Sequence, residues 1–256
     1  MRTADELRDA VEAYLGSLAL APELGALEQP LRYSLESGGK RVRPLLCLAV
    51  AEANGASLED AMPAAAALEL VHTFSLVHDD LPALDDDDER RGRPSAHVAF
   101  GEGVALLAGD ALVAEAFRLA LTYASPEVAR HLAAATLGMI GGQYRDITGD
   151  TADLEELHRL KTGQLFVAAV QIGLDVAAVG AAERPRWIAF GEDMGLLFQV
   201  VDDLLDGDGY VDRLGTEATR ALADDVAARA SSRLDELACD TTVLRDLLDA
   251  LTFRTG

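Results

Sequence analysis

One stretch constrains this chain more than any other: an apolar, helix-like segment over residues 71–78 leads into a dense acidic cluster. Residues 79–89 contain six aspartates and one glutamate, and Arg90 and Arg91 follow at once. Mutual repulsion would destabilise such a cluster unless cations neutralised it. Divalent cations with oxygen ligands are the natural neutralisers. The stretch therefore predicts one half of a metal site, with the other half supplied elsewhere in the chain.

The composition and the local signals indicate an all-α fold. Half of the 256 residues are hydrophobic, whereas aromatic residues make up 5%. Ala, Leu, Val, Asp, Glu and Arg dominate, which favours helices, and no alternating strand pattern of useful length occurs. Thr3 and Glu6 form a capping box for a first helix. We expect a single domain over residues 1–256, a bundle of about ten helices, over roughly 3–20, 22–30, 44–54, 60–81, 102–124, 126–148, 153–180, 184–206, 215–238 and 242–253.

A second acidic pattern ends the helix expected over 184–206. Asp202 and Asp206 are four residues apart, so their carboxylates lie on one helix face, with Asp203 alongside. Repulsion between the two carboxylates makes that spacing unfavourable, and a metal ion bound between them makes the interaction energy favourable. A solvated acidic face is the alternative for either pattern taken alone.

The first acidic pattern should fold back on itself. Pro82 cannot sit in the middle of a helix, so the chain should bend there and bring Asp85 toward Asp79. Mg²⁺ keeps several waters and prefers one or two carboxylates together with substrate phosphates. Two such acidic helix ends facing each other therefore predict a bound pyrophosphate.

Cations near these motifs indicate what else is bound. Residues 38–44 place three positive charges at a glycine-rich break before a helix, a setting that suits an anion. His72 lies seven residues before Asp79, on roughly the same helix face. Lys161 interrupts another helix together with Thr162, and Lys40 and Lys161 are the only lysines. Arg90 and Arg91 have a simpler alternative, pairing with residues 86–89. A second, metal-free pyrophosphate pocket is expected from Lys40, Arg43, His72 and Arg91.

Charge and cysteine usage limit the partners. A net charge of −22 argues against nucleic acid and anionic membranes, which leaves small molecules as the expected partners. The longest apolar run, 165–182, is interrupted by Gln171 and Asp175, so a buried core helix is expected rather than a membrane span. Cys47 and Cys239 are expected to be free core cysteines in a reducing compartment. No signal peptide is seen, and a cytoplasmic protein is expected.

Taken together, the motifs resemble the short-chain trans-isoprenyl diphosphate synthases of the polyprenyl synthetase family, and most closely the bacterial farnesyl diphosphate synthases. The resemblance covers roughly residues 30–206 in the right order, and such a series is far more specific than any one motif. The matching pieces are GGKRVRP at Gly38–Pro44, the stretch His72–Pro94, AGDAL at Ala108–Leu112, GGQYRD at Gly141–Asp146, KTGQL at Lys161–Leu165 and FQVVDDLLD at Phe198–Asp206.

The resemblance implies helices around a central apolar cavity and a Mg²⁺-dependent head-to-tail condensation of isopentenyl diphosphate with dimethylallyl or geranyl diphosphate. The expected product is farnesyl diphosphate, and the departing pyrophosphate is thought to take the released proton. The implied ligands of about three Mg²⁺ are Asp79, Asp80, Asp85 and Asp202, supported by Asp203 and Asp206. Contacts to the allylic diphosphate are implied for Arg90, Lys161, Thr162 and Gln199. Isopentenyl diphosphate is implied to bind Lys40, Arg43, His72 and Arg91, with Gln143 and Asp146 lining or bracing the cavity.

Product length is expected to depend on Phe74, five residues before Asp79, where a large ring closes the floor of the cavity. Ser75 leaves room, so a C20 product, geranylgeranyl diphosphate, remains an alternative. Phe74 also fits ordinary core packing. The family is homodimeric, and the apolar helix over 102–124 is the candidate contact.

The chain departs from the family after Asp206, because residues 207–215 contain no lysine. A shortened closing segment is expected there, with Arg213 or Arg220 as possible substitutes for the missing cation. Other functions stay open: a class I terpene cyclase, a non-catalytic partner subunit, or an acidic metal-buffering protein. The cyclase would not need an isopentenyl diphosphate pocket, the partner subunit usually lacks one acidic motif, and the buffering protein would not need Lys161 or Arg90.

Overall fold

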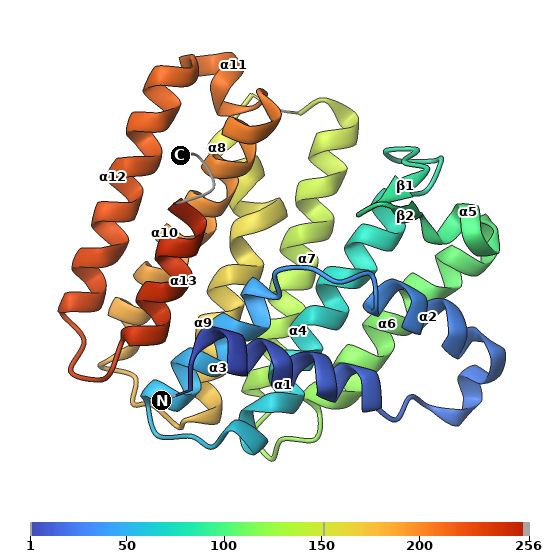
Figure 1. The fold of residues 1–256 in the computed structure, drawn as a ribbon, viewed down its shortest axis with the longest axis horizontal. Helices are drawn as coiled ribbons and strands as arrows, with labels where there is room; N and C mark the ends of the chain where they lie inside the picture. Colours follow the sequence, from blue (N-terminus) through green and yellow to red (C-terminus); the bar gives the residue numbers. More distant parts are fainter. Residues whose placement is uncertain (1, 151, 253–256) are drawn as a thin grey trace.

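Helix α4 (Leu58–Asp79) lies at the centre of the fold (Figure 1). In the computed structural model, which describes residues 2–150 and 152–252, α4 packs against α3 (Val42–Ala53), α6 (Glu102–Ala120) and α9 (Gln164–Val176). Helices α7 (Glu127–Thr148) and α10 (Arg184–Asp206) pack on α9, and α12 (Thr216–Asp235) covers the outer side of α10. The remaining elements are α1 (Ala4–Ser17), a 3₁₀ turn (Pro22–Leu27), α2 (Glu28–Leu35), α5 (Ala96–Phe100), α8 (Leu154–His158), a π-helical turn (Arg159–Gly163), α11 (Tyr210–Leu214), α13 (Thr242–Thr252) and two strands, β1 (Glu89–Arg90) and β2 (Arg93–Pro94).

The helix starts follow local capping rules. Thr3 Oγ1 accepts a hydrogen bond from the Glu6 amide at 3.2 Å, and the Glu6 carboxylate accepts one from the Thr3 amide at 2.8 Å. This is the capping box expected from the sequence. Ser57 caps α4 in the same way, because its hydroxyl accepts a hydrogen bond from the Asp60 amide at 3.1 Å. Both caps satisfy amides that have no partner inside the helix.

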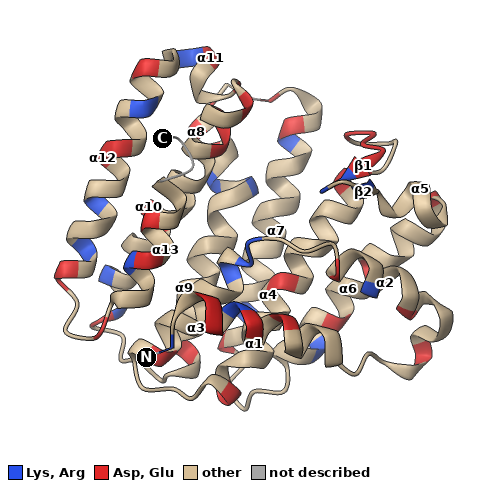
Figure 2. Cartoon of the chain, in the orientation of Figure 1, with Lys and Arg blue, Asp and Glu red and all other residues tan. Residues whose placement is uncertain are grey.

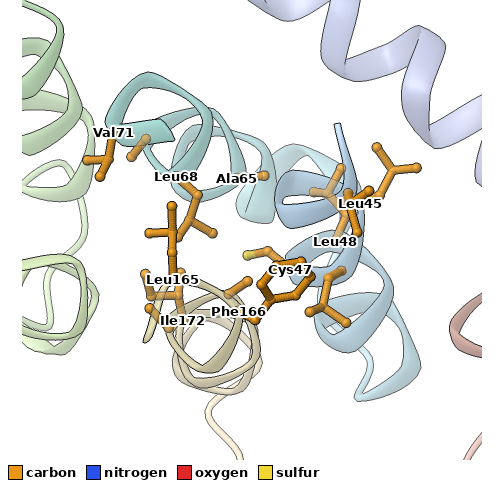
Figure 3. Close-up of a cluster of buried hydrophobic side chains, with 14 of the residues drawn as sticks. Leu45, Cys47, Leu48, Ala65, Leu68, Val71, Leu165, Phe166 and Ile172 are labelled. Carbon is orange, nitrogen blue, oxygen red and sulfur yellow. The ribbon is translucent and has the colours of Figure 1, made fainter. Parts of the chain in front are cut away.

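The core lies between α3, α4 and α9 (Figure 3). Residues 42–51 of α3 are all buried, and a run of alanines over residues 64–67 of α4 lets neighbouring helices approach closely. Cys47 is a free, buried cysteine, as expected, while Cys239 is free and only partly buried. Labelled core side chains in Figure 3 are Leu45, Cys47, Leu48, Ala65, Leu68, Val71, Leu165, Phe166 and Ile172.

The all-α prediction is confirmed, and the long helices fall within a few residues of their expected bounds. Three local features differ from expectation. The loop after the acidic cluster contains a two-stranded antiparallel hairpin, β1–β2. Short helices α5 and α11 occupy segments expected to be irregular. The helix expected over 153–180 is divided by the π-helical turn, and its final residues lie outside α9.

Charged residues are unevenly distributed over the fold (Figure 2). Acidic and basic residues alternate along α12, and acidic residues gather in the loop before β1. By contrast, α6 and α7 expose large apolar side chains, including Leu106, Leu107, Leu137 and Ile140, each at least 47% exposed. Within residues 2–150 and 152–252, no helix combines the length and the apolar character needed to cross a membrane.

Candidate active site

The first acidic motif forms the end of α4, where the chain reverses. The Asp85 amide donates a hydrogen bond to the Asp79 carbonyl at 2.9 Å, so the bend at Pro82 brings Asp85 back to Asp79 as predicted. Burial raises the pKa of the Asp79 carboxyl to about 6, and the negative charge of Asp85 adds to that rise, while Lys161 opposes it. The negative charge of Asp79 at this helix end is therefore unfavourable, and a bound cation would stabilise it.

Asp80 faces the β1–β2 hairpin and not the same direction as Asp79. Its carboxylate is 3% exposed and accepts hydrogen bonds from the Arg90 guanidinium, the Nε contact being 2.9 Å. Arg90 also donates to Asp87 at 3.0 Å, which confirms the expected pairing between the outer acidic residues and a neighbouring arginine. Burial raises the pKa of Asp80 and the Arg90 hydrogen bonds oppose the rise. This ion pair anchors the hairpin beside the cavity.

The second acidic motif lies on the last turns of α10, and α4 and α10 both end toward the top of the view in Figure 1. Asp202 is partly buried and lines a cavity together with Lys40 and Arg43. Asp203 is 3% exposed, and both of its oxygens accept hydrogen bonds from the protein. Asp206 is exposed at the end of the helix. Adjacent aspartates of this motif therefore have different surroundings.

The residues expected to form a cationic pocket meet at a cavity of about 260 Å³, which Asp202 and Glu69 also line. Arg43 is buried, its guanidinium lies 4.8 Å from the Phe166 ring centroid, and its Nε has no hydrogen-bond partner. Burial lowers the pKa of Arg43 to about 10, which leaves it cationic at neutral pH. A buried cation with an unpaired donor is a good anion ligand. All four residues predicted for this pocket line it: Lys40, Arg43, His72 and Arg91.

His72 and Arg41 behave differently from their cationic neighbours. Burial lowers the pKa of His72 well below its ordinary value, and Arg43 and Arg91 push it in the same direction. The imidazole is therefore neutral at pH 7 and acts through hydrogen bonds. Arg41, the third charge of the glycine-rich break, is bound by Glu12 at 2.7 Å and Glu69 at 2.6 Å, so it shapes the pocket without being available to a ligand.

A second cavity of about 350 Å³ continues from the first, and the two share Arg43 and His72. Phe74 lies in its wall, 8% exposed, with its ring edge-on to the His78 ring at 5.2 Å between centroids. Gln143 of α7 lines this cavity, while the sequence prediction missed His78 and the other residues that α7 contributes to the wall. The spacing of three to four residues along α7 is the signal that could have shown them, in Met139, Ile140, Tyr144 and Ile147.

The π-helical turn carries Lys161 and Thr162 into this cavity, where the sequence predicted an interruption. Lys161 forms an ion pair with Asp146, and the Thr162 hydroxyl donates to Gln199 Oε1 at 2.7 Å. The turn packs directly on α7: a Cβ added at Gly142 would lie 2.5 Å from the backbone nitrogen of Lys161. Only glycine fits at position 142, whereas a Cβ at Gly141 would meet nothing within 4 Å. π-helical turns of this kind frequently mark functional sites.

The donor set suits Mg²⁺ bound together with a diphosphate. Among the residues that the structure describes, no three carboxylate, imidazole or thiolate groups converge to hold a metal ion unaided. Asp79 lies at the end of α4, Asp85 in the turn that follows it and Asp202 on α10, all with carboxylate oxygens, and Lys161 lies near Asp79. Mg²⁺ takes one or two carboxylates and completes its shell with water and phosphate oxygens. The residues present therefore fit this ion.

The fold places the chain in a class first. It is the isoprenoid synthase fold: a farnesyl/geranylfarnesyl diphosphate (FPP/GFPP) synthase from Zymomonas mobilis superposes with a TM-score of 0.86 at 31% identity, covering 97% of this chain and 95% of that one. A geranyltranstransferase from Thermotoga maritima gives 0.84 at 28% identity, covering 98% and 96%. The family model described as polyprenyl synthetase matches residues 25–230.

Sequence relatives give the same family. The farnesyl diphosphate synthase of Bacillus subtilis (strain 168) is 40% identical over 205 residues, or 74% of this chain and 69% of the relative. The geranylgeranyl diphosphate synthase of Cyanophora paradoxa is 41% identical over 202 residues, or 72% and 67%. The chain belongs to the polyprenyl synthetase family and is a short-chain trans-prenyl diphosphate synthase, a prenyltransferase, which confirms the resemblance.

Proposed function

We propose that residues 1–256 form one isoprenoid synthase domain that condenses isopentenyl diphosphate with dimethylallyl or geranyl diphosphate to give farnesyl diphosphate and pyrophosphate. The observation that carries this proposal is the junction of two cavities at Arg43 and His72. One cavity is cationic and suits a diphosphate without metal. The other is apolar and begins at Asp79 and Lys161, where a second diphosphate would bind with its prenyl chain inward.

The residues divide between the two substrates. Lys40, Arg43, His72 and Arg91 would hold isopentenyl diphosphate, and the allylic diphosphate would bind Arg90, Lys161, Thr162 and Gln199. Asp79, Asp85 and Asp202 would hold Mg²⁺, which when bound supplies positive charge that stabilises the leaving pyrophosphate. Asp80, Asp203 and Asp206 would support these ligands from behind or at the rim, since Asp80 and Asp203 already accept hydrogen bonds from the protein.

The bond changes follow from this division. The allylic C–O bond breaks and its electron pair leaves with the pyrophosphate, whose charge Lys161 and Arg90 stabilise. The double bond of isopentenyl diphosphate forms the new C–C bond to the allylic carbon, and the released pyrophosphate takes the proton. Phe74 and Met139, both buried, exclude water from the cation that forms.

A geranylgeranyl product is the second candidate, and the open wall of the cavity favours it. Ile140, Tyr144 and Ile147 line the cavity and are 51–65% exposed, so that side is not closed within one chain. Relatives near 40% identity include both farnesyl and geranylgeranyl diphosphate synthases. Phe74 supports the C15 product, since its ring narrows the cavity below Asp79.

Product analysis tests the proposal. Purified protein is incubated with isopentenyl diphosphate, Mg²⁺ and either dimethylallyl or geranyl diphosphate, and the products are separated by liquid chromatography with mass detection. Farnesyl diphosphate as the main product supports it. Cyclic hydrocarbon would indicate a terpene cyclase, and no elongated product from any allylic primer would sink the proposal in favour of a non-catalytic subunit.

We also propose a homodimer through α6 and α7 and, from the free cysteines, a reducing and cytoplasmic location. The apolar side chains exposed on these helices form a face suited to a second copy. Light scattering should give twice the monomer mass, and Leu107→Asp, at a position 54% exposed, should give the monomer mass with an unchanged helical spectrum. A monomeric unmodified protein would contradict this assembly.

A further inference from the structure

The carboxylate of Asp203 is the centre of a hydrogen-bond chain between three elements. Its Oδ1 accepts from Gln199 Nε2 at 2.7 Å, and its Oδ2 accepts from the Tyr210 amide at 2.8 Å. Gln199 Oε1 in turn accepts from the Thr162 hydroxyl at 2.7 Å. This series of hydrogen bonds therefore links the π-helical turn, α10 and α11. Movement of any one of these elements would break a bond to another.

The turn after α10 is built around this carboxylate. Gly209 has φ +52°, and a Cβ there would lie 2.2 Å from Asp203 Oδ2. Only glycine allows the backbone to come so near and to present the Tyr210 amide to Asp203. The lysine-free segment over residues 207–215 is therefore held to α10 by a buried carboxylate. Arg213, one of the expected substitutes for a lysine, instead donates to the Ala152 carbonyl at 3.3 Å.

Among the described residues at this centre, His158 has a buried polar atom without a hydrogen-bond partner. Its ring is 11% exposed, and its Nδ1 is buried without a hydrogen-bond partner. Asp203 Oδ2 lies 3.9 Å away, too far for a hydrogen bond, and the ring stands edge-on to Tyr210 with 5.2 Å between centroids. A groove of about 450 Å³ beside α8 and α10, which His158 and Gln199 line, gives the imidazole room to move.

A buried nitrogen without a partner is unfavourable, and a small ring movement toward Asp203 removes the cost. That movement would add a third hydrogen bond to Asp203 and press the ring against Tyr210. His158 is also the last residue of α8, directly before the turn that carries Lys161 and Thr162. Its position thus couples the closing segment to the residues proposed to bind the allylic diphosphate.

We propose that His158 is a positioning residue: through Asp203 and Tyr210 it holds residues 207–215 against the end of α10 and keeps Thr162 and Gln199 in place for the allylic diphosphate. The part that concerns substrate rests on the proposed function. Thr162 lines the cavity proposed for the allylic substrate, whereas Lys40 and Arg91, proposed for isopentenyl diphosphate, line the other cavity, which includes neither Thr162 nor Gln199. Loss of His158 should therefore affect one substrate and not the other.

Two substitutions distinguish the contribution of the His158 ring from that of its Nδ1 atom. His158→Phe keeps an aromatic ring against Tyr210 without a donor, and His158→Asn keeps an amide near the place of Nδ1. In the free protein, His158→Phe should speed hydrogen exchange of the Tyr210 amide about tenfold, and His158→Asn should return it to within about twofold of the unmodified rate. Addition of Mg²⁺ and inorganic pyrophosphate should protect residues 207–215 less in His158→Phe than in the unmodified protein.

Steady-state kinetics supply the second readout. His158→Phe should raise the KM for the allylic diphosphate about tenfold and leave the KM for isopentenyl diphosphate within about twofold, with rescue by His158→Asn. His131→Phe is the matched control, because His131 Nδ1 lies 2.7 Å from a buried carboxylate, that of Asp175, on α9. This control should lower the melting temperature without altering the exchange of Tyr210.

The outcomes distinguish the inference from the proposed function. An unchanged Tyr210 exchange rate in free His158→Phe overturns the positioning role, whatever the activity. Faster exchange spread evenly over all helices also overturns it, since that result indicates a general loss of stability. An unmodified protein that makes no prenyl diphosphate overturns the proposed function, while the exchange comparison in the free protein still decides the link between His158, Asp203 and Tyr210.

Discussion

Phe74→Ala tests whether one ring measures the product. The substitution removes a six-carbon ring from the cavity wall, and a prenyl unit contains five carbons, so the vacated space is comparable with one further unit. We expect the main product to be one isoprene unit longer than that of the unmodified protein. The catalytic groups at Asp79 and Lys161 are left in place, so kcat should stay within about fivefold.

The stability cost of this substitution is smaller than for a fully enclosed ring. Phe→Ala in a core costs about 3–5 kcal/mol, but one side of Phe74 already faces the cavity and its clearest ring contact is His78. A loss of about 2 kcal/mol is expected from these fewer contacts. For a chain of this size that corresponds to a fall in melting temperature of roughly 4–8 °C. The protein should therefore remain folded at assay temperature.

The assay compares product lengths by liquid chromatography with mass detection, using geranyl diphosphate as primer. Phe190→Ala is the control, because Phe190 is fully buried in α10 and does not line the cavity. It should lose at least as much stability with no change in product length. A folded Phe74→Ala protein that stops at the original length would refute the measuring role and leave Phe74 as a packing residue.

Three further predictions concern the charged groups. With a pKa raised to about 6, Asp79 is about nine-tenths ionised at pH 7 and about one-tenth at pH 5. Calorimetry with inorganic pyrophosphate present should therefore show that Mg²⁺ affinity falls about tenfold more between pH 7 and pH 5 in the unmodified protein than in Asp79→Asn. An equal fall in affinity in the two proteins would contradict this prediction. Arg43→Lys keeps the positive charge but loses the planar guanidinium that lies over Phe166. The KM for isopentenyl diphosphate should therefore rise about tenfold, and a rise in KM for the allylic substrate alone would contradict the assignment of Arg43. Asp202→Asn should raise the Mg²⁺ concentration for half-maximal activity about tenfold with little change in melting temperature. Asp203→Asn should instead lower the melting temperature by roughly 3–6 °C. A similar change in the Mg²⁺ requirement of both variants would show that the buried carboxylate of Asp203 also binds the ion.

Features governed by neighbours in sequence were predictable. The capping box at Thr3 and Glu6, the helix period and the bend at Pro82 each depend on residues within one or two turns. Asp85 returns to Asp79 because Pro82 prevents the helix from continuing, and the amide of Asp85 then finds the Asp79 carbonyl. The two acidic helix ends and their cations could be recognised for the same reason.

Features that depend on distant packing were not predictable. Arg41 reads as one of three charges facing an anion, yet Glu12 and Glu69 bind it from 29 and 28 residues away. Asp202 and Asp203 are adjacent in the sequence, yet Asp202 lines a cavity, whereas Asp203 is buried and accepts hydrogen bonds from Gln199 and from the Tyr210 amide of α11. The acidic motif by itself does not separate these two surroundings.

The guanidinium of Arg43 links the stability of the protein to its supply of substrate. It is buried over two aromatic rings with an Nε that has no hydrogen-bond partner, a cost that the folded chain bears until an anion arrives. A diphosphate at a hundred times its dissociation constant would stabilise the folded state by about 2.7 kcal/mol. Such a change alters the unfolded fraction about a hundredfold and hence exposure to proteases. A cell that runs short of precursor would then lose the enzyme as well as its flux, through turnover of the empty form.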